Sequence, residues 1–120
     1  MNLMVIFFAG AFLCNGVPHL TSGLQGIPFP TPFAKPSGIG ESSPVVNFLW
    51  GSFNLLMGIL MLSQCPVSVG LNPGFLLLLA GALVMGLISA LHFGRVRTPA
   101  PRPKAGTRDE QKPDFRKHRP

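Results

Sequence analysis

Two histidines and one asparagine are the residues of this chain with the most versatile chemistry for an apolar setting. His19, Asn47 and His92 each lie near one end of an apolar segment. An imidazole can ligate a metal or exchange a proton near neutral pH, and an amide both donates and accepts hydrogen bonds. If the fold brings these residues to one depth of a membrane, they could hold a metal, bind a quinone headgroup or move protons.

The simpler interpretation is that the histidines are interfacial and bond to water, lipid phosphate or a neighbouring carbonyl. No third protein ligand of an obvious kind accompanies them, and no sequence-local spacing indicates a metal. We therefore expect no metal site and no cofactor, and we retain His19, Asn47 and His92 as candidates for binding a small ligand. The sequence has no paired carboxylates, Walker loop, Rossmann glycines or Ser/His/Asp arrangement, so we expect no enzymatic activity.

Small and polar residues form a stripe on each of two apolar segments. Spacings of 4, 3 and 4 residues place the first stripe on one face of a helix. Its members are Asn47, Gly51, Asn54 and Gly58, and those of the second stripe are Ala82, Gly86 and Ala90. Glycine lets another backbone come close, and asparagine can hydrogen-bond across such a contact. We expect these faces to pack on each other, on a second copy or on a partner, with a ligand-facing role as the alternative.

Three apolar segments must position these residues: 3–20, 44–64 and 74–93. About 20 helical residues at 1.5 Å each span roughly 30 Å, the thickness of the hydrocarbon layer. The first segment is the shortest and most polar, and it lacks the basic residues that open a signal peptide. The sequence thus predicts an all-α membrane protein with three transmembrane helices. Trp50, about seven residues into the second segment, is expected to anchor at the headgroups or to pack against loop aromatics.

The segment 21–43 is rich in proline and glycine and is expected to be an irregular loop. Its apolar residues, among them Phe29 and Phe33, suit the membrane interface, because non-helical backbone cannot face lipid in the hydrocarbon core. Ser43 and Pro44 then provide a hydroxyl N-cap and a proline at the first helical position. At the far end of the third helix, Gly94 is expected to be the C-cap.

Charge is concentrated after the third segment. Only 12% of the residues are charged, against about 25% in soluble domains. Nine of the ten Lys and Arg residues follow Phe93, which argues for a membrane topology signal and against nucleic-acid binding. We expect 95–120 to be a disordered, cytoplasmic, basic tail. The residues expected to meet anionic lipid headgroups are Arg95, Arg97, Arg102 and Lys104.

Several short motifs resemble a pattern of small uncharacterised bacterial integral membrane proteins. They are Val17-Pro18-His19, the run 29–36 (FPTPFAKP), the run 42–51 (SSPVVNFLWG) and His92-Phe93-Gly94. The resemblance covers roughly residues 15–95 and implies a bacterial inner membrane. It implies no activity and no functional residue.

Two kinds of function are consistent with these features. The first is an accessory or scaffold subunit, in which the second and third helices pack against a membrane partner or a copy of the chain. The small-residue stripes and the scarcity of ionisable groups favour it. The second is a binding or permeation module for a small solute or a small amphipathic ligand, such as a quinone or lipid.

Overall fold

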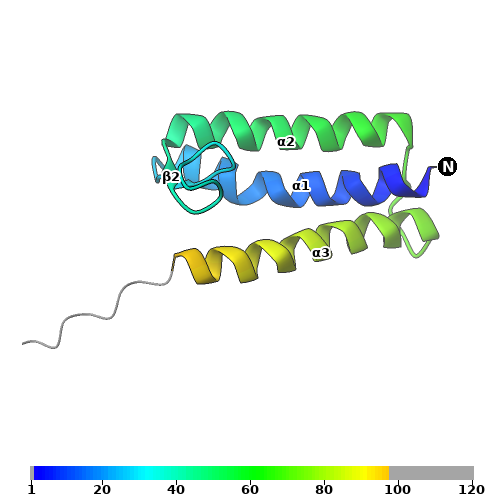
Figure 1. Ribbon diagram of the computed structural model, residues 1–120. Coiled ribbons are helices and arrows are strands. Elements are labelled where there is room, and N and C mark those ends of the chain that lie inside the picture. Colours follow the sequence, from blue (N-terminus) through cyan, green and yellow to red (C-terminus); the bar gives the residue numbers. More distant parts are fainter. Residues whose placement is uncertain (1, 98–120) are drawn as a thin grey trace, which may run out of the picture.

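The computed structural model describes residues 2–97 and consists of three long helices, with a folded loop between the first two at one end of the bundle (Figure 1). The helices are α1 (Leu3–Leu24), α2 (Pro44–Gln64) and α3 (Pro73–Val96). Within the loop, β1 (Phe29–Pro30) pairs antiparallel with β2 (Glu41–Ser42). All three helices are long and apolar enough to cross a membrane, which confirms the expectation of a mostly helical chain with three candidate membrane spans.

Each helix begins at a polar side chain that caps its first turn. Asn2 Oδ1 accepts a hydrogen bond from the Val5 N–H at 3.4 Å, Ser43 Oγ from the Val46 N–H at 3.3 Å, and Asn72 Oδ1 from the Phe75 N–H at 2.9 Å. Proline at the start of α2 and α3 loses nothing by lacking a donor, because the first amides of a helix have no partner within it.

Two helix ends differ from the sequence prediction. α1 continues past residue 20 to Leu24, because the first loop proline is Pro28, four positions further on. Gly23 lies inside this last turn, where a Cβ would stand 2.5 Å from Phe48 N, so this glycine permits close helix packing. α3 also continues past Gly94 to Val96, and the Arg97 N–H closes the last turn on Phe93 O at 2.9 Å. Gly94 is therefore not the C-cap.

The first helix lies between the other two (Figure 1). α1 packs antiparallel to α2 and parallel to α3, whereas α2 and α3 scarcely touch each other. Glycines allow both contacts: a Cβ on Gly10 would collide with the carbonyl oxygen of Leu78 in α3, and one on Gly51 with the backbone of Leu20 in α1. Of the contacts expected for the two stripes, that of α2 on α3 is wrong, because each of these helices packs on α1. Packing on a second copy or on a partner stays a prediction.

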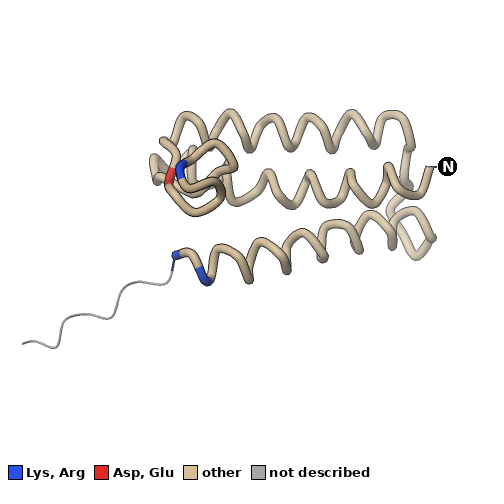
Figure 2. The backbone as a smooth tube through the Cα atoms, in the orientation of Figure 1, with Lys and Arg blue, Asp and Glu red and all other residues tan. Residues whose placement is uncertain are grey.

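The outward faces of the bundle are apolar, and its described charges gather at one end. Leu83 is 74% exposed, as suits a side chain that faces lipid. Within residues 2–97 the charged side chains are Lys35, Glu41, Arg95 and Arg97, all at the end where the loop folds over the helices (Figure 2). Arg102, Lys104 and most of the expected disordered tail lie outside the described residues.

Candidate functional site

A cavity of about 160 Å³ lies where the loop meets the three helices. We call it the histidine cavity. It is lined by Asn15 and His19 of α1, Trp50 of α2, His92 and Phe93 of α3, and loop residues 30–32 and Gly38. All three helices and the loop thus contribute to its wall.

His19 and Asn47 form the polar centre beside this cavity. His19 Nδ1 lies 2.9 Å from Asn47 Oδ1, and the two side chains are 2% and 0% exposed. The Asn47 amide nitrogen donates to the carbonyl oxygens of Phe29, Ser42 and Ser43 at 2.9, 3.2 and 3.1 Å. Asn47 therefore ties the loop to α2 and at the same time orients the imidazole of α1.

A second pair of amides lies one helical turn deeper. The Asn15 side-chain nitrogen donates to Asn54 Oδ1 at 3.0 Å, and the Asn54 nitrogen donates to Trp50 O at 2.8 Å. Asn15 precedes His19 by four residues, so both project from one face of α1. Asn15 Oδ1 is not used by these bonds, and Asn15 lines the cavity.

Trp50 contributes a buried donor with no partner. Its Nε1 atom has no hydrogen-bond partner among the described residues. The indole stacks on Phe53, with ring centroids 5.5 Å apart, and meets Phe33 edge to face at 5.0 Å. An unpaired buried N–H costs about 1–3 kcal/mol, so in native proteins such a group is often completed by water or a ligand.

The loop is held down on the end of α3 by two side chains. His92 Nε2 donates to Gly38 O at 2.6 Å. The Arg97 guanidinium lies 4.7 Å above the Phe29 ring and 3.9 Å from a carboxylate oxygen of Glu41. Arg97, expected from the sequence to meet lipid headgroups, lies on the folded loop; its contact with lipid stays a prediction.

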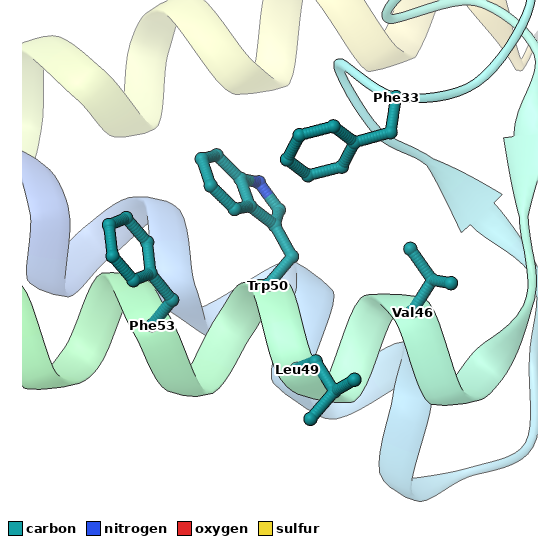
Figure 3. Close-up of a pocket in the computed structure, with 5 residues that line it drawn as sticks. All are labelled: Phe33, Val46, Leu49, Trp50 and Phe53. Carbon is teal, nitrogen blue, oxygen red and sulfur yellow. The ribbon is translucent and has the colours of Figure 1, made fainter.

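An apolar groove of about 420 Å³ also has Trp50 in its wall. It is lined by Phe33, Val46, Leu49, Trp50 and Phe53, and we call it the aromatic groove. Figure 3 shows the rings of Phe53, Trp50 and Phe33 in a row along α2, with the indole nitrogen on the side that faces Phe33. Leu49 and Phe53 are 59% and 48% exposed, so the groove is open at the outer surface of the bundle.

The structure brings together the three residues proposed to bind a ligand. His19 and Asn47 are hydrogen-bonded, and His92 lines the same cavity as His19. No group of three or more His, Cys, Asp or Glu side chains that could hold a metal occurs within residues 2–97.

The residues of the two stripes lie in different surroundings. All four members of the α2 stripe are buried against α1 or the loop. In α3 a Cβ on Gly86 would meet Cys14 of α1 at 3.2 Å, and Ala82 N lies next to Gly10. Ala90 is exposed, and Arg95 is exposed at the end of the same helix.

Sequence reasoning did not single out Asn15, Trp50 or the loop residues as parts of a site. Asn15 carried a usable signal, because it lies one turn before His19 in an otherwise apolar helix. For Trp50, packing against loop aromatics was one of two expectations, and its contact with Phe33 corresponds to it.

Comparisons with protein families, with curated proteins and with solved structures gave no match to this chain. Inferences about function therefore depend on the geometry described above.

Proposed function

We propose that this protein binds a small amphipathic molecule within the membrane. The polar group would occupy the histidine cavity, and the apolar part would lie in the aromatic groove. One observation carries the proposal: Trp50 lines both spaces, and its buried N–H lacks a partner in the described structure. The site thus joins polar atoms to an apolar surface that is open to lipid.

The sizes of the two spaces support this division. About 160 Å³ accommodates several water molecules or one small polar group, and the groove of about 420 Å³ has room for part of a chain. A quinone and a lipid are the two ligand types anticipated from the sequence. Their common feature is a compact polar head on an apolar tail.

The internal packing also favours this proposal over a scaffold that binds partners through its glycine stripes. Gly51 and Gly58 are in contact with α1, and Gly86 also faces it. A partner helix could use these faces only if α1 left them. The polar residues of the stripe, Asn47 and Asn54, bond within the chain as well.

The fluorescence of Trp50 tests the proposal directly, because it is the chain's single tryptophan and the chain has no tyrosine. The protein in lipid nanodiscs would be titrated with a short-chain benzoquinone, which quenches indole emission. Occupation of a site gives quenching that saturates, whereas random encounters in the bilayer give quenching that rises linearly.

A matched control moves the fluorophore within the same protein. In the double variant Trp50→Phe, Phe75→Trp the indole lies at the opposite end of the bundle, at the start of α3. We expect saturable quenching from Trp50 and linear quenching from the moved indole. Linear quenching at both positions, together with no effect of dioctanoylglycerol on Trp50 emission, would contradict the proposal.

A second candidate is an accessory subunit that docks through α3. Three leucines at four-residue spacing, Leu83, Leu87 and Leu91, are 74%, 62% and 54% exposed along its outward face. Lipid covers such a face equally well, so the face by itself does not identify a partner. Recovery of a stoichiometric membrane protein in mild-detergent pull-downs, lost in a Leu83→Ala, Leu87→Ala variant, would support docking. Recovery of the chain alone would argue against it.

A further inference from the structure

We infer that the headgroup taken up by the histidine cavity is uncharged and carries a hydroxyl, which donates to His19 Nε2 and accepts from Trp50 Nε1. This inference rests on the proposed function and narrows the ligand class. It follows from the direction of each hydrogen bond around the cavity.

The first step fixes the orientation of the Asn47 amide. Its nitrogen faces three carbonyl oxygens, those of Phe29, Ser42 and Ser43, at 2.9, 3.2 and 3.1 Å. A carbonyl can only accept, so the group that faces these three atoms must be the NH₂. The amide oxygen is therefore the atom that meets His19.

The second step fixes the imidazole tautomer. Because Asn47 Oδ1 can only accept, His19 Nδ1 carries the proton of the 2.9 Å bond. In the neutral ring Nε2 is then a bare acceptor, and no described residue donates to it. An imidazolium would lack a carboxylate partner here, since Glu41, the acidic residue of the described part of the chain, lies beside Arg97.

The third step adds a donor close to that acceptor. Trp50 Nε1–H is a donor only, and it is buried without a partner in the described structure. The His19 and Trp50 ring centroids are 6.4 Å apart, and both rings line the cavity. A hydroxyl oxygen can accept from one ring while its hydrogen is donated to the other.

Within the described part of the chain only uncharged groups line the cavity, which excludes ionic headgroups from the proposed ligand class. None of the charged side chains among residues 2–97 lines it. A phosphate placed there would lose its hydration without gaining a cation, which is far more costly than burying a neutral group. A quinone carbonyl would satisfy Trp50 but would turn a lone pair toward His19 Nε2. A quinol, or the free hydroxyl of a diacylglycerol, satisfies both groups.

Calorimetric titration of the protein in nanodiscs, corrected with empty nanodiscs, tests this chemistry with probes of matched size. The first set is a short-chain benzoquinol kept reduced under anaerobic conditions, the corresponding quinone, and the quinol dimethyl ether. The second set is dioctanoylglycerol and dioctanoyl phosphatidic acid. We expect the hydroxyl-bearing member of at least one set to bind at least tenfold more tightly than its analogues. The set that binds distinguishes a quinol from a glycerolipid.

Two variants assign the preference to the proposed atoms. His19→Phe removes the acceptor. We expect this variant to bind the hydroxyl-bearing probe less than twofold more tightly than its analogues, against at least tenfold for the native protein. Phe53→Leu alters the aromatic groove and should weaken the binding of every probe in a set by the same factor. If Phe53→Leu reduced the preference and His19→Phe preserved it, the assignment to His19 would be wrong.

The remaining outcomes separate the two proposals. Binding without a preference for the hydroxyl-bearing member in either set would refute the hydroxyl headgroup and leave the proposed function in place. Tighter binding of phosphatidic acid than of dioctanoylglycerol, with no preference for the quinol in the first set, is one such result. Failure of every probe to bind would contradict both.

Discussion

Asn47 is the residue on which the geometry of the site depends. Its four hydrogen bonds join α1, the loop and α2: the amide oxygen accepts from His19, and the two hydrogens of the amide nitrogen are shared among three carbonyl oxygens. The sequence indicated that His19, Asn47 and His92 lie at a common depth in the membrane. All three are close to the ends of apolar helices, and the ends of neighbouring spanning helices lie at similar positions along the bundle axis. The sequence could not predict which side chains face one another across that depth. The rotation of each helix about its axis is set by packing, here by glycines of α1, α2 and α3.

Replacing Asn47 should destabilise the protein more than replacing the other buried asparagine of α2. Asn47→Leu leaves the His19 N–H and two loop carbonyls without their partner, since Ser43 O still accepts from the Asn47 backbone N–H. We expect a loss of about 2–4 kcal/mol in the free energy of unfolding. Asn54→Leu breaks one bond to another side chain, that with Asn15, and should cost about 1 kcal/mol. Thermal unfolding in detergent would measure both, and an equal loss would show that Asn47 does not organise the loop.

At the scale of elements, small residues determine which helices meet. The sequence stripe on α2 did mark a contact face, but the partner is α1, which itself carries small residues toward both neighbours. Gly81 was overlooked because the expected α3 stripe followed four-residue spacing from Ala82, whereas the closest contact lies one residue earlier. A Cβ on Gly81 would collide with Phe7 O of α1. Such a contact depends on the exact crossing point of two helices, which composition alone does not specify.

Two glycines of α3 provide a matched comparison for this packing. Gly81→Ala places a methyl group against a backbone carbonyl that cannot move aside, so α1 and α3 must separate. We expect it to destabilise the protein by about 1–3 kcal/mol. In Gly94→Ala the added methyl group meets no atom within 4 Å, and the change should stay within about 0.5 kcal/mol. Equal melting temperatures for the two variants in detergent would contradict the close contact of α1 with α3.

At the scale of the whole molecule, three helix ends and the loop form one polar pole, and the opposite end carries no described charge (Figure 2). The end of α1, the start of α2 and the end of α3 meet at this pole (Figure 1). The sequence predicted this sidedness from its basic residues alone. It could not predict that Arg97 would contact Phe29 and Glu41 of the loop, because these contacts form only when the loop folds back over α3.

The positive-inside rule applied to this shape predicts that the loop pole faces the cytoplasm and that the α2–α3 connection faces outward. The native thiols lie conveniently for a test, since Cys65 is the C-cap of α2 at the outer end and Cys14 lies within α1. In intact cells a small membrane-impermeant maleimide should label the native protein, and Cys65→Ser should abolish that labelling. Adding Ser37→Cys to the Cys65→Ser variant places a thiol in the exposed part of the loop, and labelling there should require cell lysis. Labelling at position 37 in intact cells, with Cys65 protected until lysis, would show that the protein has the opposite orientation. The histidine cavity would then lie on the outer side.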